Sequence, residues 1–205
     1  MTNTRLDRFY LIVDDASWIA RLVPIGVKLV QLRIKDRGED HIRGQIRDAL
    51  KICAAHQAQL IINDYWKLAI EEGCDFIHLG QEDLQSIDLA AIRRAGLKLG
   101  VSTHDHDELA YVLPMKPDYV ALGPIYSTKF KAMRFAPQGL ERIGEWKKLI
   151  GAVPLVAIGG LTVDRAAGVL KAGADILSVV TDVTLHIDPK RRVAEWLSAT
   201  RDRKS

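Results

Sequence analysis

The sequence contains little cysteine, and its two cysteines do not form a CxxC pair. Cys53 falls within a helical pattern, and Cys74 directly follows Gly73 ahead of an apolar run. A chain of 205 residues with two isolated cysteines is not a small cystine-rich domain. We expect both thiols to be buried as small apolar side chains and expect no disulfide.

The sequence also lacks a long apolar run and a strong excess of either charge. The N-terminal segment MTNTRLDRFYLIVDD has neither the apolar core nor the cleavage site of a signal peptide, and no stretch is long enough to span a membrane. The net charge of +3 is too small to indicate nucleic-acid binding. We therefore expect a cytoplasmic protein whose partners are neither membranes nor nucleic acids.

Short runs rich in Val, Ile and Leu recur along the chain. They are FYLIV at 9–13, LVQL at 29–32, LIIN at 60–63, FIHL at 76–79, LKLGV at 97–101, YVALG at 119–123, LVAIG at 155–159 and ILSVV at 176–180. Runs of this length, mostly unbroken by polar residues, are typical of strands covered on both faces, as in a parallel sheet.

Helical periodicity fills most of the gaps, clearest at 40–56, 164–173 and 188–200. The last segment begins with Asp188 as a candidate N-cap and Pro189 in the first turn. Eight alternations predict an α/β fold, a (β/α)8 TIM barrel forming a single domain over 1–205, with short loops and a flexible basic tail at 201–205. An open doubly wound sheet has the same alternation and stays an alternative. No GxGxxG follows the first strand, which disfavours a dinucleotide site.

Polar groups suited to phosphate and Mg²⁺ follow nearly every predicted strand. In chain order they are Gln31, Arg33 and Lys35; Asn63 and Asp64; Gln81, Glu82 and Asp83; Ser102, Thr103 and His104; Thr128, Lys129 and Lys131; Gly159 and Gly160; Thr181 and Asp182. In a barrel these strand ends share one face. Cations and free N–H groups suit phosphate, and carboxylates suit Mg²⁺, so the pattern predicts a Mg²⁺–pyrophosphate site with Asp64 and Asp83 as metal ligands.

Each of these residues also has a structural explanation when taken alone. Asp64 could cap the following helix, and Asp83 could cap a turn. The glycine pair 159–160 could be a tight turn, and His78, inside a strand, is expected to be a core or supporting residue. The joint placement at successive strand ends favours the functional interpretation.

Five segments resemble motifs of the thiamine-phosphate synthase family. They are VQLRIKD, INDYWKLAIEEGCDFIHLGQEDL, LGVSTHDHDEL, DYVALGPIYSTKFK and VPLVAIGGLT, in the family's order and over essentially the whole chain. The resemblance implies a (β/α)8 barrel and the Mg²⁺-dependent joining of 4-amino-2-methyl-5-hydroxymethylpyrimidine diphosphate to thiazole phosphate, with release of pyrophosphate. It also makes a homodimer worth testing.

The resemblance implies a role for each matching residue. Asp64 and Asp83 would hold Mg²⁺, and the catalytic groups would be Lys131, Arg33 and Ser102. The pyrimidine diphosphate would be bound by Gln31, Arg33, Lys35, Asn63, Ser102 and Lys131. The thiazole phosphate would be bound by Thr128 with its neighbours Lys129 and Phe130, and by the backbone of Gly160, Val180 and Thr181.

Three positions depart from the family pattern. Phe130 stands where a second Thr is expected, Tyr65 replaces an Arg, and Thr181 replaces a Ser while keeping the hydroxyl. Two other functions are therefore considered. A thiazole tautomerase-like isomerase would use His104 or His106 for proton transfer, and a silent barrel would bind a phosphorylated ligand without turnover. Neither has a use for the retained carboxylates.

Overall fold

The computed structural model describes residues 6–127 and 135–201. In these residues parallel strands close into a barrel, with each strand pairing with its sequence neighbours and β1 pairing with β8. The strands are β1 (Phe9–Val13), β2 (Leu29–Leu32), β3 (Gln59–Asn63), β4 (Phe76–Leu79), β5 (Lys98–Thr103), β6 (Tyr119–Leu122), β7 (Leu155–Ile158) and β8 (Ile176–Val179). The closed order confirms the predicted (β/α)8 barrel and rules out the open sheet.

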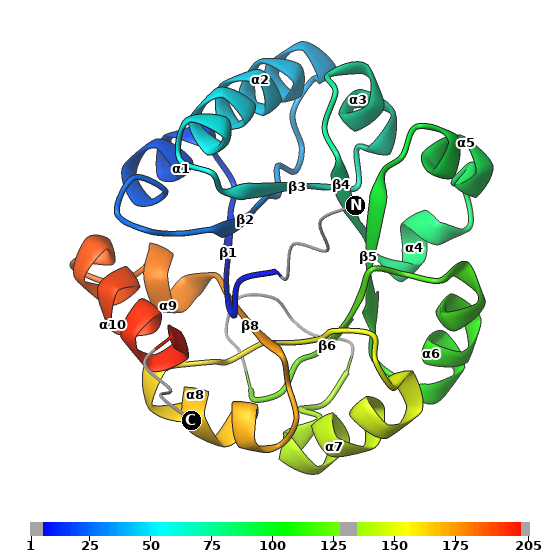
Figure 1. The fold of residues 1–205 in the computed structure, drawn as a ribbon, viewed down its shortest axis with the longest axis vertical. Coiled ribbons are helices and arrows are strands. Elements are labelled where there is room, and N and C mark those ends of the chain that lie inside the picture. The colour runs from blue at the N-terminus through cyan, green and yellow to red at the C-terminus, as the bar shows by residue number, and fades with distance from the viewer. Residues whose placement is uncertain (1–5, 128–134, 202–205) are drawn as a thin grey trace.

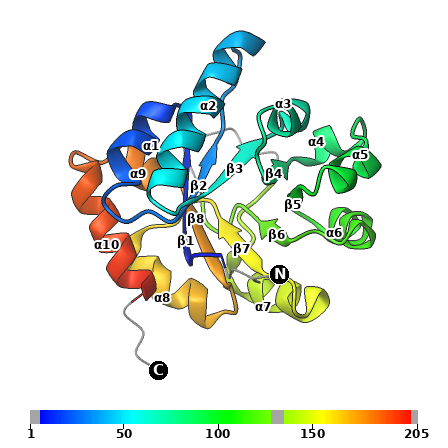
Figure 2. The same cartoon turned by 45° about the horizontal axis from the view of Figure 1, so that its top comes forward.

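A ring of helices encloses the strands, as Figure 1 shows, and the tilted view in Figure 2 separates the two layers. The helices are α1 (Ala16–Leu22), α2 (Glu39–Ala55), α3 (Trp66–Glu71), α4 (Gln81–Leu84), α5 (Leu89–Arg94), α6 (His106–Val112), α7 (Gly139–Ile150), α8 (Val163–Lys171), α9 (Thr181–Thr184) and α10 (Pro189–Arg201), with a 3₁₀ turn η1 (Leu113–Met115). The three helices predicted from periodicity lie within two residues of α2, α8 and α10. The predicted N-cap of α10 is present, because Asp188 Oδ1 accepts a hydrogen bond of 3.1 Å from Arg191 N.

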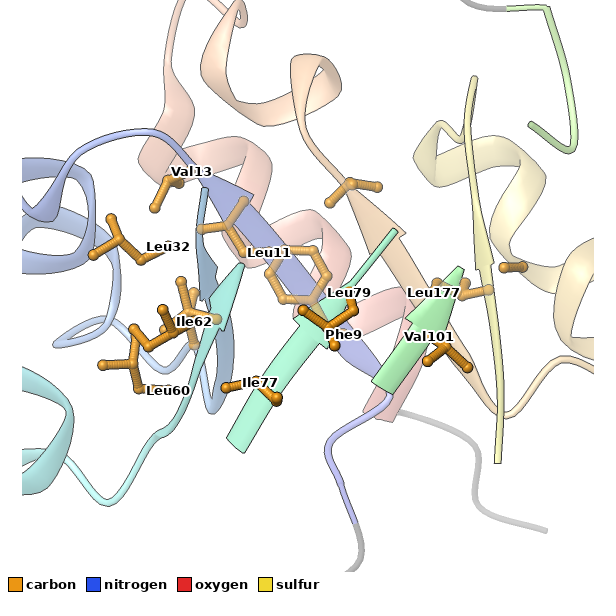
Figure 3. Packing of buried hydrophobic residues seen from close by; sticks show 14 of the residues in the cluster. Phe9, Leu11, Val13, Leu32, Leu60, Ile62, Ile77, Leu79, Val101 and Leu177 are labelled. Atoms are coloured by element: carbon orange, nitrogen blue, oxygen red, sulfur yellow. The ribbon is translucent and has the colours of Figure 1, made fainter. Parts of the chain in front are cut away.

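Side chains alternate between the two faces of each strand, and the outward ones pack against the helices. Phe9, Leu11 and Val13 of β1 point outward into one continuous cluster of buried apolar residues. Figure 3 shows this cluster along successive strands. The intervening β1 residues Tyr10 and Ile12 belong to a separate cluster inside the barrel. Strands buried on both faces explain why the sequence shows unbroken apolar runs.

Helix α2 shows how the outer layer is specified. Its buried residues Ile42, Ile46, Ala49 and Cys53 recur at helical spacing and pack against the barrel wall. Cys53 and Cys74 are both free and buried, and burial raises the pKa of each thiol to about 12. The prediction of two buried, unpaired thiols is confirmed.

The ends of the chain bear on two predictions. Arg201, the last residue of α10, bonds Asp7 Oδ2 at 2.7 Å and Gly26 O at 2.9 Å. The rest of the predicted flexible tail, 202–205, lies outside the described residues. Across 6–127 and 135–201, the helices are too short or too polar to cross a membrane.

Candidate active site

Charged side chains from the segments that follow β2, β3 and β4 meet at the carboxyl ends of these strands. The Lys35 ammonium group donates a hydrogen bond to Asp64 Oδ2. Asp83, in the short helix α4, accepts a bond of 3.3 Å from Gly80 N. Burial and the neighbouring Asp64 carboxylate raise the pKa of Asp83, and the Lys35 charge opposes this shift. The two predicted metal ligands are therefore brought together, with a cation beside them.

Asp64 has a backbone conformation that few residues other than glycine adopt. Its φ is +63°, in the left-handed region. Its N–H bonds His78 O at 2.9 Å, and its own carbonyl accepts from Trp66 N at 2.8 Å. Helix α3 starts after Tyr65 and has no side-chain cap, so the capping explanation for Asp64 is wrong. Strain of this kind persists where surrounding bonds hold it, and such residues cluster at functional sites.

The pair of carboxylates fits a magnesium ion. Asp64 and Asp83 offer oxygen ligands, and a divalent cation would offset both the burial of the Asp83 carboxylate and its repulsion by Asp64, which together raise the pKa of Asp83. The described residues contain no group of three or more His, Cys, Asp or Glu suited to a metal. Mg²⁺ bound by two carboxylates would draw its other oxygen ligands from water and from substrate phosphate, which is its usual mode of binding.

A chain of hydrogen bonds crosses the barrel interior from β2 to β5. Gln31 Nε2 donates to the Tyr10 hydroxyl at 2.6 Å, and the hydroxyls of Tyr10 and Tyr119 lie 2.9 Å apart. The Tyr119 hydroxyl is 2.7 Å from His78 Nδ1, and His78 Nε2 is 2.9 Å from Ser102 Oγ. Burial lowers the pKa of His78 to about 4, so the ring is neutral near pH 7. His78 is thus a buried supporting residue, as expected.

Asn63 presents an unpaired donor to the same interior. Its side chain is buried, and its Nδ2 has no hydrogen-bond partner among the described residues. In the sheet register Asn63 lies beside His78. Leaving a buried donor unpaired costs about 1–3 kcal/mol, so this group is suited to an acceptor supplied by a ligand.

The strand ends on the opposite side of the barrel offer backbone groups. Gly159 and Gly160 have φ of +98° and +65°, and a Cβ at Gly160 would lie 2.6 Å from Ser127 O. Glycine is therefore required for the close approach of the two loops. No described residue accepts a hydrogen bond from the N–H of Gly160 or Thr181. Backbone donors without an acceptor among the described residues suit phosphate oxygens, and Val180 is the N-cap residue between β8 and α9.

Arg165 was not predicted from the sequence. Its guanidinium group bonds Gly160 O and lies 4.2 Å from the Tyr126 ring centroid. Because Arg165 lies on the first turns of α8, the only available signal was its position after the glycine pair.

Two strand-end residues from the sequence pattern have structural roles instead. Thr103 is fully buried; its hydroxyl donates to Ala121 O at 3.0 Å and accepts from Trp146 Nε1 at 2.9 Å. Both Asp182 oxygens are engaged by Arg192, at 2.8 and 2.9 Å. These residues tie helices to the barrel wall rather than facing the site.

The predictions for Thr128, Lys129, Phe130 and Lys131 lie outside the described residues. On the far side of that segment, Phe135 stacks on His104 with ring centroids 4.4 Å apart. His104 Nδ1 is also 2.8 Å from a carboxylate oxygen of Glu108.

Comparison with known proteins identifies the family. The sequence model of the family described as thiamine monophosphate synthase matches residues 9–183. A thiamine-phosphate synthase of Rhizobium etli is 64% identical over 196 residues, which cover 96% of each chain. The chain belongs to the thiamine-phosphate synthase family. It is accordingly an enzyme of the transferase class.

Other relatives agree with this family assignment. A thiamine-phosphate synthase of Serratia proteamaculans is 47% identical over 92% of this chain and 89% of its own. The structure of thiamine phosphate pyrophosphorylase from Pyrococcus furiosus has a TM-score of 0.84 at 23% identity, covering 95% of this chain and 96% of that one. A 3-hexulose-6-phosphate synthase structure also matches, with a TM-score of 0.66 at 18% identity over 94% of this chain and 99% of that one. Structural likeness at these identities shows the fold alone, so the family assignment depends on the sequence.

The departure at Tyr65 from the synthase pattern has a visible structural setting. Its hydroxyl donates to Ile34 O at 3.3 Å, and the side chain lines an open cleft of about 390 Å³ beside Asp64. A neutral side chain thus occupies the position where the resemblance implies a cation. The isomerase and silent-barrel alternatives find no support in the comparisons.

Proposed function

We propose that this synthase joins 4-amino-2-methyl-5-hydroxymethylpyrimidine diphosphate to thiazole phosphate, with Mg²⁺ held by Asp64 and Asp83. The observation that carries the proposal is the pairing of two strand-end carboxylates with Lys35, in a chain whose family makes thiamine phosphate. When bound, Mg²⁺ would supply positive charge to the diphosphate that leaves.

Different residues bind different parts of the pyrimidine diphosphate. Arg33 and Lys35 bind the diphosphate; with Mg²⁺ held by Asp64, the Lys35 ammonium group would donate to phosphate oxygen in place of that carboxylate. Asn63 directs its free amide donor at the substrate, and Ser102 contacts the pyrimidine. Lys131 is assigned to the pyrophosphate by the family resemblance.

The thiazole phosphate is assigned to the opposite strand ends. The N–H groups of Gly160 and Thr181, which have no acceptor among the described residues, donate to its phosphate, with Val180 lining the same end. Thr128, Lys129 and Phe130 are assigned to this side by resemblance. The two substrates then approach each other across the barrel mouth, which lowers the entropy lost in bringing them together at the transition state.

The reaction needs charge stabilisation more than proton transfer. The bond between the methylene carbon and the diphosphate oxygen breaks, and pyrophosphate leaves with the electron pair. The electron-rich aminopyrimidine stabilises the resulting cation, and the thiazole nitrogen supplies the electron pair of the new bond. Electrostatic stabilisation of the leaving group by Arg33, Lys35 and Lys131 is the main protein contribution.

An assay with both substrates, with Mg²⁺ or with EDTA, tests the proposal. We expect thiamine phosphate and pyrophosphate in equal amounts with Mg²⁺, and neither with EDTA. Calorimetric binding of thiazole phosphate without product in the presence of Mg²⁺ would contradict the proposed reaction. Isomerisation of the thiazole phosphate in that case would point to the tautomerase.

A cytoplasmic location and a homodimer also belong to this proposal. Two buried free thiols suit a reducing compartment, in which the phosphorylated substrates would be kept. Light scattering coupled to gel filtration would decide between a dimer and a monomer.

A further inference from the structure

The hydrogen-bond chain through the barrel has a direction, because one of its ends can only donate. Gln31 Nε2 is an amide nitrogen and has no acceptor lone pair. The Tyr10 oxygen accepts this bond, so its single hydrogen is left for the Tyr119 oxygen 2.9 Å away. The Tyr119 hydrogen then goes to His78 Nδ1 at 2.7 Å.

This direction fixes the tautomer of His78 and the role of Ser102. An Nδ1 that accepts from Tyr119 carries no hydrogen, so the neutral ring carries its hydrogen on Nε2. His78 Nε2–H then donates to Ser102 Oγ at 2.9 Å. The Ser102 oxygen is occupied as an acceptor, and its own hydrogen is left for a further partner.

We propose that this chain holds the Ser102 hydroxyl as a hydrogen-bond donor, and that Tyr10, Tyr119 and His78 are positioning residues for the pyrimidine substrate. The proposal rests on the proposed function, in which Ser102 contacts the aminopyrimidine. A donor at Ser102 selects one of the two ring nitrogens as its partner and rejects the exocyclic amino group, which is itself a donor. The chain therefore orients the ring before any bond breaks.

The packing around Tyr119 is suited to holding this chain in one arrangement. Tyr119 is fully buried, and its ring lies 5.6 Å from the Phe76 ring and 5.9 Å from the Tyr10 ring. A Cβ at Gly100 would lie 2.1 Å from Tyr119 Cζ, so glycine at this position leaves the space that the phenol occupies. The chain is also neutral, so it supplies a donor without adding positive charge beside a ring that itself becomes positive.

The first test measures the His78 tautomer in the substrate-free enzyme. Long-range ¹H–¹⁵N correlation spectra separate protonated from unprotonated ring nitrogens, and His78→Asn assigns the signal. We expect the Nε2–H tautomer in the wild type and a mixture of tautomers in Tyr119→Phe. The Nδ1–H tautomer in the wild type would reverse the chain and overturn the proposal.

The second test measures kinetics in Tyr119→Phe and Tyr10→Phe, with Tyr111→Phe as the matched control. Tyr111 is exposed on the outer face of α6 and takes no part in the chain. We expect kcat/KM for the pyrimidine diphosphate to fall about tenfold in Tyr119→Phe and less in Tyr10→Phe, the effect of losing one positioned hydrogen bond. The KM for thiazole phosphate should be unchanged in all three variants.

Substrate analogues connect the two tests. Two monodeaza pyrimidine diphosphates each replace one ring nitrogen with CH. With the wild-type enzyme, one of them should have a lower kcat/KM than the natural substrate. The Tyr119→Phe substitution should lower the kcat/KM of that analogue little further. Equal, additive losses for both analogues would overturn the assignment of Ser102 as the donor. Absence of turnover in the wild type would instead contradict the proposed function, and the tautomer would still decide the direction of the chain.

Discussion

The side chains outside the barrel wall differ in kind from those inside it. The outer layer, between strands and helices, is a continuous cluster of apolar residues such as Leu11, Ile46 and Trp196. The inner layer has a small apolar cluster, and the polar side chains of Gln31 and His78 are buried within the same barrel. The outer layer makes the fold, and the inner layer prepares a site at the strand ends. Changes outside should therefore alter stability alone, and changes inside should alter the chemistry.

The largest effect is expected at Gly100, where one substitution should alter both stability and chemistry. In Gly100→Ala the new methyl group would lie 2.1–2.5 Å from ring and hydroxyl atoms of Tyr119, which is fully buried. We expect the free energy of unfolding to fall by at least about 3 kcal/mol. Urea denaturation measures the change in stability, and kcat/KM of the folded variant measures the effect on the site. A folded variant with wild-type kinetics would show that the Tyr119 position is unimportant.

Asp83→Asn should separate activity from stability. The loss of a metal ligand should lower kcat/KM by roughly 10²–10³-fold, as for other groups that stabilise transition-state charge. Because the folded pKa of Asp83 is raised, its ionised form destabilises the metal-free fold, and this loss develops as pH rises through the raised pKa. Denaturation in EDTA at neutral pH should thus find Asp83→Asn at least as stable as the wild type. Turnover within a few-fold of wild type would remove Asp83 from the metal site.

Ile46→Ala probes the outer layer alone. Ile46 is fully buried on α2, so truncation should lower the free energy of unfolding by roughly 2–5 kcal/mol. The kcat and both KM values, measured well below the melting temperature, should stay at wild-type levels. A change in either KM would show that outer packing reaches the site.

The buried His78 should make stability depend on pH. Its folded pKa of about 4 lies below the ordinary value of 6.5, so its contribution is fully present above pH 6.5 and is lost as pH falls toward 4. The shift corresponds to about 3 kcal/mol. Asp83 contributes with the opposite sign, since its pKa is raised. Between pH 6.5 and pH 4, the free energy of unfolding should fall less in His78→Gln than in the wild type. An equal dependence on pH in the two proteins would contradict the burial argument.

Gly44→Ala should give the smallest effect and the opposite sign. Gly44 lies inside α2, and a Cβ there would meet nothing within 4 Å. Alanine should raise the free energy of unfolding by roughly 0.5–1 kcal/mol, because it loses less backbone entropy in a helix. Destabilisation in the same denaturation assay would contradict the finding that a Cβ at Gly44 meets no neighbouring atom.

The sequence supports prediction of the outer layer better than prediction of the inner one. Apolar runs and the period of α2 locate the strands and the helix, because burial on both strand faces leaves an unbroken pattern. The four-residue helices α4 and α9 were missed, since they are too short for periodicity. β5 extends to Thr103 rather than Val101 because its polar end pairs with β6.

The sequence predicted individual site residues but not the backbone conformation and hydrogen bonds that link them. Asp64 and Asp83 follow apolar runs and could be placed at strand ends, but the left-handed backbone of Asp64 has no clear sequence signal. Tyr10 and Tyr119 were counted as apolar strand residues. Their contact depends on the relative register of β1 and β6, which are not neighbours in the barrel, and the closure of the barrel fixes that register.

The most direct test of the central claim is metal binding at the two carboxylates. Electron paramagnetic resonance of Mn²⁺, used in place of Mg²⁺, would measure free ion in the presence and absence of the pyrimidine diphosphate. The claim that the strand ends and the diphosphate share one ion predicts tight binding only with the diphosphate, and loss of that binding in both Asp64→Asn and Asp83→Asn. Equally tight binding by the wild type and both variants would contradict it.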